Sequence, residues 1–203
     1  MNDETAIAEL RAELARTRAQ LRVLADRQEI LDCSHRFCRG VNRRDRELLR
    51  SAFHPDAIDD HGFYCGGIDG FLDWIDTVYD DIAQTQHYVS NQSVELDGDG
   101  AHAEQYWLVV NVRRAGGEVI IRGGRYIDRF ERRGGRWAIA ARVCFTEWNG
   151  ATQKIDFPPE VQAMLAQSGI AALDRTDLSY ARPLAITRAH TSARPHAGGA
   201  ART

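Results

Sequence analysis

The sequence predicts a single α+β domain in which helices cover the concave face of a strongly curved, mostly antiparallel sheet and leave a pocket between the two layers. Two observations support this prediction. Up to residue 82 the apolar residues have helical spacing, whereas from residue 86 the period changes to two. Tight-turn sequences then separate four β-rich runs, and Gly123 and Gly124 interrupt the third run where a curved sheet needs a bend or bulge.

The first helix is predicted over residues 4–39, with Asn2 or Asp3 as its N-cap and Gly40 as its stop. Its apolar residues follow alternating three- and four-residue steps: Ile7, Leu10, Leu14, Leu21, Leu24 and Leu31. Charged residues fill most positions between them, which predicts a solvated helix with one narrow apolar seam. This seam either pairs with another subunit or lies on its own domain.

Two shorter helices are predicted to follow. Asp45 is the expected cap of "RELLRSAF", which Pro55 ends. After the short extended stretch "DAIDDHGFYCGG" the helical pattern returns in "IDGFLDWIDTVYDDIA", with Asp69 as the expected cap. The apolar face of this third helix consists of Phe71, Trp74, Ile75, Val78, Tyr79 and Ile82.

The four β-rich runs predict an antiparallel meander whose faces differ in function. On the second run, alternation places Trp107, Val109 and Asn111 on one face and Tyr106, Leu108 and Val110 on the other. We expect Trp107 and Asn111 to face the pocket, because an isolated amide among apolar residues suits a binding site, although a simple core or interface remains the alternative. The residues expected to complete the pocket are Arg125, Tyr126, Phe145 and Trp148.

The chain divides into four expected segments. Residues 1–18 form a helical extension and residues 19–150 the α+β domain. Residues 151–185 form a short helix starting near Pro159 and an extended arm, "DRTDLSYARPL". Residues 186–203, rich in Ala, Arg and Gly, form a disordered tail.

Composition disfavours several classes of protein. The net charge of −3 and the pI near 6.2 give no basic field for nucleic acid. No run approaches the roughly 20 apolar residues of a membrane span, and the charged N-terminus lacks the apolar core of a signal peptide. We therefore expect a soluble, cytoplasmic protein whose four cysteines are reduced, packed thiols. The glycines lack the strand-to-helix context of a phosphate loop, so we expect no nucleotide or flavin cofactor.

Two histidines are candidates for chemistry. His87, in "TQHYVSN", is a base, a ligand or a packed core residue. His61 stands beside Asp59 and Asp60, which suggests a metal site, but alternation sends the two carboxylates to opposite faces, so we expect no metal and place His61 at the pocket mouth. Three further histidines of the folded part are expected at the surface or on helix flanks: His35, His54 and His102.

Four stretches resemble the NTF2-like, or SnoaL-like, superfamily over roughly residues 20–150: "RFCRGVNRRDRELL", "HPDAIDDHG", "TQHYVSN" and "GGRYIDRFERRGGRWAI". The resemblance is to the branch that includes scytalone dehydratase, bile acid 7α-dehydratase and γ-hexachlorocyclohexane dehydrochlorinase. It implies a cone-shaped fold and a His–Asp dyad. His87 matches the histidine position, whereas Asn42 stands at the aspartate position and Phe37 at the position of a tyrosine that acts as an acid in part of the family.

The resemblance implies a cofactor-independent lyase or isomerase acting on a small apolar, polycyclic or steroid-like molecule. His87 would be the base and Asn42 would orient it or bind a substrate oxygen, with Phe37 in the substrate pocket. The alternative is a non-catalytic binding or scaffolding protein, because Asn42 carries no charge and Phe37 no hydroxyl. The resemblance further implies a homotrimer or homodimer formed through the outer face of the sheet, with the C-terminal arm across a neighbour.

Overall fold

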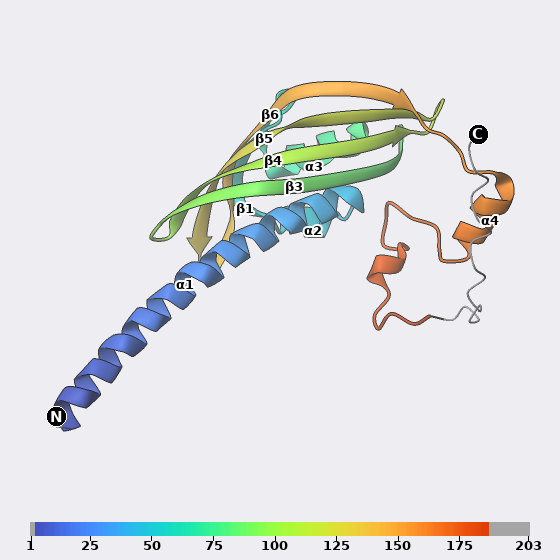
Figure 1. The fold of residues 1–203 in the computed structure, drawn as a ribbon. Coiled ribbons are helices and arrows are strands. Elements are labelled where there is room, and N and C mark those ends of the chain that lie inside the picture. The colour runs from blue at the N-terminus through green and yellow to red at the C-terminus, as the bar shows by residue number, and fades with distance from the viewer. Residues whose placement is uncertain (1–2, 187–203) are drawn as a thin grey trace, which may run out of the picture.

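The structure is a computed structural model that describes residues 3–186, and its elements follow the predicted order (Figure 1). Helix α1 spans Asp3–Asn42 and is followed by α2 (Arg46–Arg50), β1 (Phe53–Asp60), β2 (Cys65–Gly67) and α3 (Ile68–Val78). The meander consists of β3 (Ile82–Asp97), β4 (Gly100–Arg113), β5 (Glu118–Arg133) and β6 (Arg136–Gln153). Helix α4 (Pro159–Ala166) and a 3-10 turn (Leu178–Tyr180) complete the described chain.

The six strands form one curved, mixed sheet in the order β2-β1-β6-β5-β4-β3. Only β1 and β6 run parallel; the other neighbours are antiparallel. The pairing of β5 with β6 shifts register between Gly123 and Gly124, as predicted, and a Cβ at Gly124 would stand 1.8 Å from the carbonyl oxygen of Phe145. The sheet therefore bends where only glycine fits. The α+β prediction, with helices on the concave face, is confirmed (Figure 1).

Helix α1 differs from its predicted extent at the C-terminal end. The helix continues through Gly40 to Asn42, so the prediction that Gly40 stops it is wrong. Gly40 is instead needed for packing, because a Cβ there would lie 2.6 Å from the backbone nitrogen of Leu49 in α2. The two extra residues carry Asn42 to the edge of β3.

The N-terminal half of α1 projects away from the sheet (Figure 1). Burial of α1 against the domain begins at Asp26, and the apolar seam residues Ile7, Leu10, Leu14, Leu21 and Leu24 are 48–66% exposed. The interpretation that this seam packs on its own domain is therefore wrong. One continuous helix crosses the predicted boundary between residues 18 and 19.

Of the N-caps predicted for α2 and α3, the structure confirms the first and not the second. Asp45 caps α2 by accepting a hydrogen bond from the backbone nitrogen of Leu48 at 3.1 Å. Asp69 does not cap α3, because β2 runs directly into the helix and Gly67 takes the cap position without a side-chain hydrogen bond. The side chain of Asp69 instead pairs with Arg50 at 2.5 Å.

The C-terminal arm lies against its own domain. Arg175 and the Tyr180 hydroxyl bind the carboxylate of Asp45 at 3.0 and 2.8 Å, and Arg43 pairs with Asp177 at 3.2 Å. In the single chain the arm is thus held at the α1–α2 turn. Its contact with a neighbouring subunit stays a prediction. The predicted tail at 186–203 falls, apart from Ile186, outside the described residues.

Two composition-based expectations can be compared with the structure. Within residues 3–186, no helix has the length and apolar character needed to cross a membrane. Cys33 and Cys38 are buried and Cys144 is half-buried, whereas Cys65 is exposed, so the expectation of four packed thiols is wrong for Cys65.

Candidate active site

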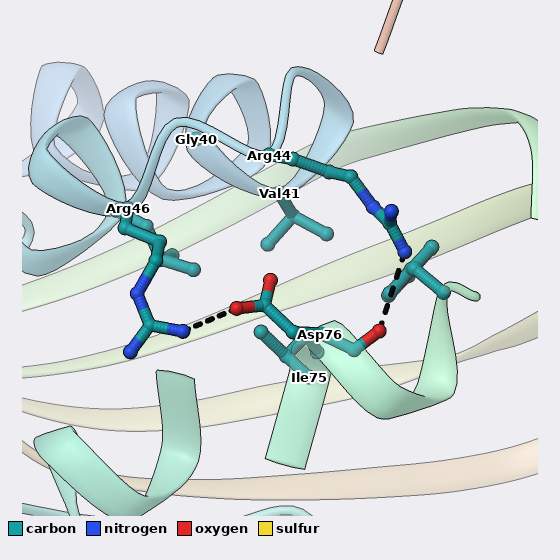
Figure 2. A pocket seen from close by; sticks show the side chains of 8 residues that line it. Gly40, Val41, Arg44, Arg46, Ile75 and Asp76 are labelled. Atoms are coloured by element: carbon teal, nitrogen blue, oxygen red, sulfur yellow. Dashed lines mark hydrogen bonds and ion pairs between the residues drawn. The ribbon is translucent and has the colours of Figure 1, made fainter. Parts of the chain in front are cut away.

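The end of α1, the start of α2 and the end of α3 are held together around a small pocket (Figure 2). Arg44 donates to the backbone oxygen of Asp76 at 3.2 Å, and Arg46 pairs with the Asp76 carboxylate. The pocket between these helices has a volume of about 10 Å³, room for about one water, so it is a packing gap. The contacts of Arg44 and Arg46 fix the end of α3, which carries Tyr79, relative to the end of α1, which carries Asn42.

His87 is held by side chains from two other elements. Asn42 Oδ1 lies 2.7 Å from His87 Nδ1 and accepts from the His87 backbone nitrogen at 3.0 Å. Because an amide oxygen only accepts, the proton of the neutral ring is on Nδ1 and Nε2 is the free base nitrogen. The Tyr79 hydroxyl, 3.1 Å away, donates to that Nε2. Asn42, His87 and Tyr79 therefore form one hydrogen-bonded chain.

The environment keeps the members of this chain neutral. Burial, together with the charge of His61, lowers the pKa of His87 to about 3. Burial raises the pKa of Tyr79 to about 12. Near neutral pH the chain thus presents an unprotonated imidazole and an intact phenol, which is a base and a hydrogen-bond donor.

A groove gives access to this chain from the side. It lies between the C-terminal turns of α1 and the start of β3 and has a volume of about 430 Å³. Its lining residues are His35, Cys38, Arg39, Asn42, Arg43, His87, Tyr88 and Val89. Both the candidate base and its orienting amide are therefore reachable by a small molecule.

His61 forms a second pair deeper in the fold, at the end of β1. Its Nδ1 hydrogen-bonds Oδ1 of Asp59, whose side chain is 0% exposed, while the His61 side chain is 12% exposed. Burial acts to lower the pKa of His61, but the charge and hydrogen bond of Asp59 outweigh it and raise the pKa to about 9. His61 is therefore an interior imidazolium and not a residue of the pocket mouth, where it was expected.

Arg142 of β6 and Asp128 of β5 form a third pair on the concave face. The guanidinium is bidentate to the carboxylate, with both contacts at 2.7 Å, and lies over the rings of Phe37 and Tyr126 at 4.3 and 4.0 Å. Both side chains are 0% exposed. Sequence analysis missed this pair, although alternation along β5 and β6 would have placed both residues on the same face.

The structure brings most of the other expected site residues to the concave face. Phe37, Trp107 and Asn111 are 1%, 7% and 3% exposed. Arg125, Phe145 and Trp148 are not brought there: Arg125 pairs with Glu147 at 2.5 Å on the outer face, and Phe145 and Trp148 are 49% and 51% exposed. The reason is alternation, because Tyr126 and its partner Cys144 point inward and force their neighbours outward.

One histidine outside the site was placed wrongly from the sequence. His54 was expected at the surface but is 3% exposed, with Nε2 2.8 Å from the backbone oxygen of Glu131. Burial, followed by the charges of Arg133 and Arg136, lowers its pKa. His54 is a packed residue satisfied by the sheet.

Several buried polar atoms on the concave face have no hydrogen-bond partner within the described chain. They are Asp59 Oδ2, Trp107 Nε1, Asn111 Oδ1 and Arg142 Nη1; another, the Nε atom of Arg44, lies at the α1–α2 turn. Buried donors and acceptors are rarely left unpaired, so their gathering on one face is typical of a site that a ligand completes. Within residues 3–186, no group of three or more His, Cys, Asp or Glu side chains is arranged to hold a metal ion.

Comparison with known proteins places this geometry in a family. The sequence profile of the SnoaL-like domain matches residues 22–143. An uncharacterized protein of Mycobacterium tuberculosis (strain ATCC 25618 / H37Rv) is 30% identical over 144 residues, which cover 66% of this chain and 96% of the relative.

Solved structures agree with the profile. The hexachlorocyclohexane dehydrochlorinase LinA-type3 from Novosphingobium barchaimii LL02 is 25% identical with a TM-score of 0.62, covering 69% of this chain and 99% of that one. A protein of Novosphingobium aromaticivorans DSM 12444 named as a candidate scytalone dehydratase has a TM-score of 0.59 at 16% identity, covers 67% of this chain and 93% of that one, and supports the fold alone. On the matched profile and the shared fold, the chain belongs to the SnoaL-like domain family, with an NTF2-like fold.

Proposed function

We propose that the protein is a cofactor-independent lyase or isomerase that removes a proton from a small, largely apolar substrate, with His87 as the base. A hexachlorocyclohexane dehydrochlorinase is among the solved structures that are similar to this chain, which matches the SnoaL-like family profile. This similarity supports elimination or isomerisation as the class of reaction. The observation that carries the proposal is the hydrogen-bonded chain of Asn42, His87 and Tyr79, of which Asn42 and His87 line an accessible groove.

Asn42 supports this role by orienting the base. Its Oδ1 holds both the ring and the backbone of His87, so Nε2 points in one direction. An orienting amide supplies no negative charge to stabilise the imidazolium that forms during the reaction, so the base is weaker than one paired with a carboxylate. In the free protein Nε2 accepts from Tyr79, and a bound substrate has to replace that hydrogen bond.

The substrate is expected to be apolar because aromatic rings form much of the concave face. Tyr126 lies 5.8 Å from Trp107 and 5.6 Å from Phe37 between ring centroids. Such rings bind flat hydrocarbon frameworks, while the unpartnered polar atoms between them fix the orientation of one or two oxygen substituents.

The test is hydrogen–deuterium exchange at carbon. Cyclic ketones and β-hydroxy ketones are incubated with the protein in D2O and followed by proton NMR for loss of α-protons or of water. We expect exchange with the wild-type protein and a loss of about 10²-fold or more with His87→Ala. Exposed His102→Gln serves as the matched control and should leave the rate unchanged. Undiminished exchange in His87→Ala would show that another group is the base.

A second candidate function is ligand binding without catalysis. It is favoured by the low pKa of His87, about 3, and by the hydroxyl of Tyr79 on its base nitrogen. In that case ketones would bind in the groove without exchanging their protons, and Asn42→Asp would not produce exchange. The same NMR experiment therefore separates the two functions.

A further inference from the structure

We propose that His61, held in place by Asp59 on the concave face, is a second catalytic residue, which binds and protonates the substrate oxygen that gains charge or leaves when His87 removes a proton. The proposal rests on the proposed function and supplies the acid that the neutral chain of Asn42, His87 and Tyr79 lacks. It also narrows the substrate to a molecule with an alcohol or carbonyl oxygen close to the carbon that loses its proton.

The backbone places Asp59 and His61 on the same inner face. Along the parallel ladder Asp59 lies opposite Arg142 and Asp60 opposite Val143, and alternation turns the Asp59 and Arg142 side chains inward. His61, two residues after Asp59, follows the same direction. Asp59 binds Nδ1 of His61, so the second ring N–H remains for another partner.

The hydrogen bond to Asp59 is the only one that the described chain gives the His61 ring. The side chain of Cys144, on the inner face of β6, interacts with the ring and contributes to its raised pKa. A thiol sulfur is a poor acceptor compared with a carbonyl or hydroxyl oxygen. A substrate oxygen that reaches this N–H therefore gains a charge-assisted hydrogen bond in place of a weak contact.

Aromatic side chains surround the His61 ring and keep water away from it. Ring centroids lie 4.9 Å away for Phe71, 5.9 Å for Trp74 and 6.0 Å for Tyr126. A fixed N–H donor in such a dry environment stabilises developing negative charge more strongly than one in water. The carboxylate of Asp59, buried behind the ring, has one oxygen left unpartnered and cannot be reached by solvent.

The two histidines are suited to opposite roles. His61 has its pKa raised to about 9 and His87 has its pKa lowered to about 3, so near pH 7 one is charged and the other is not. The charge of His61 contributes to the low pKa of His87, which places the two rings within electrostatic reach of each other. Divergent pKa values in two neighbouring groups are the pattern of an acid and a base that act together.

The resulting elimination balances in protons and electrons. His87 Nε2 takes the proton from carbon, and the electron pair of that C–H bond forms the new C=C bond. The C–O bond breaks, its electron pair stays on oxygen, and the proton of His61 completes a water molecule. His87 ends protonated and His61 neutral, and proton exchange with solvent restores both. In an isomerisation the same proton of His61 is shared with the enolate oxygen.

The experiment uses 4-nitrophenol, whose phenolate resembles an enolate and absorbs at a different wavelength from the neutral phenol. Binding is titrated spectroscopically with the wild-type protein and with His61→Gln, Asp59→Asn and the neighbouring control Asp60→Asn. We expect phenolate binding to weaken by about ten-fold to a hundred-fold in the first two variants, because a hydrogen bond to a charged group is lost. Asp60→Asn, which changes a carboxylate outside the site, should bind as the wild type does.

The wild-type protein gives an independent test that no folding defect can obscure. Its affinity for the phenolate should fall as the pH rises through about 9, where His61 loses its proton. Phenolate binding that is independent of pH between 7 and 10, or unchanged in a folded His61→Gln variant, would overturn the proposal. His87→Ala should abolish proton exchange but retain phenolate binding, so failure of the base assignment and failure of the His61 assignment give different results.

Discussion

Asn42 determines what His87 is able to do. Its amide oxygen fixes the tautomer and direction of the imidazole but adds no charge, and burial then leaves the pKa of His87 at about 3. A base of this kind is always available near neutral pH but accepts a proton weakly. A nearby cation that stabilises the negative charge on the substrate oxygen compensates for this weak base. That is the role inferred for His61.

Replacing this amide by a carboxylate tests the balance directly. Asn42→Asp should raise the pKa of His87 toward neutrality, because an adjacent negative charge favours the imidazolium. A stronger base should then exchange ketone α-protons about ten-fold faster at pH 8, where His87 is again unprotonated. The measurement is the NMR exchange rate from pH 5 to 9. A His87 pKa that does not rise in the variant would contradict the electrostatic account.

At the residue scale, the sequence predicts the site only in part. Resemblance to the family identifies His87 and Asn42, and strand alternation places Trp107 and Asn111 on the inner face. Alternation equally places Asp59 and His61 on one face, but the two adjacent carboxylates point first to a metal site. Tyr79 was assigned to an apolar helix face, and nothing local in the sequence shows that its hydroxyl meets a histidine on the next strand.

At the element scale, Asp45 connects three parts of the fold. Its carboxylate caps α2 and receives hydrogen bonds from Arg175 and Tyr180 of the C-terminal arm. Partial burial acts to raise its pKa, but the hydrogen bonds from Leu48, Tyr180 and Arg175 lower it below the usual range. The arm therefore stabilises the α1–α2 turn next to Asn42.

We expect Asp45→Ala to lower the free energy of unfolding by about 2 kcal/mol, because it removes a helix cap and leaves two arm residues without their partner. Glu47→Ala is the matched control: it removes an exposed partner of Arg175 and should change the free energy by less than about 1 kcal/mol. Urea denaturation measures both. Equal effects in the two variants would show that the arm contacts contribute nothing.

Element types and order follow from the sequence because apolar periodicity is a local property. The meander, its hairpins and the Gly123–Gly124 bulge are predicted this way. The exact ends of helices and strands are harder to predict from the sequence, because tertiary packing determines them. Gly40 remains inside α1 since Leu49 packs against it, and α3 begins before Asp69 since β2 leads straight into it.

At the scale of the whole molecule, the exposed seam of α1 is suited to a second copy of this chain. Ile7, Leu10 and Leu14 follow heptad spacing on the exposed part of α1 that precedes Asp26, where burial against the described domain begins. In a parallel pair, Glu13 of one copy lies beside Arg18 of the other, so opposite charges flank the seam. This pairing would bring the two domains to the same end of a short coiled coil.

We expect light scattering at micromolar concentration to show a homodimer. The double variant Leu10→Ser and Leu14→Ser removes two seam side chains and should shift the mass toward the monomer. Ala12→Ser and Ala19→Ser, on the opposite side of the helix, form the matched control and should leave the mass unchanged. A wild-type monomer, or a seam variant that keeps the wild-type mass, would contradict pairing through α1.

The two histidines also make folding stability depend on pH in a defined way. His61 has a folded pKa of about 9, above its unfolded value, so its contribution is complete below about pH 6.5 and is lost as the pH rises through 9. His87 has a folded pKa of about 3, so stability falls as the pH drops below about 6.5.

The free energy of unfolding should therefore be greatest near pH 6.5 and should decline by about 1–3 kcal/mol between pH 6.5 and 9. His61→Gln should remove most of that alkaline decline without affecting the acid limb. Denaturant titrations at a series of pH values measure both limbs. An alkaline limb of equal size in wild type and variant would show that His61 is not the titrating group.

The measurement that tests the central claim most directly is a long-range ¹H–¹⁵N NMR titration of the histidines in the wild-type protein from pH 5 to 10, with His61→Gln and His87→Ala used to assign the signals. The claim predicts two interior imidazoles in opposite states at pH 7: His61 protonated on both nitrogens and titrating near 9, and His87 neutral, protonated on Nδ1 and unchanged down to pH 5. A neutral His61 at pH 7, or a His87 that titrates like an exposed histidine, would contradict it.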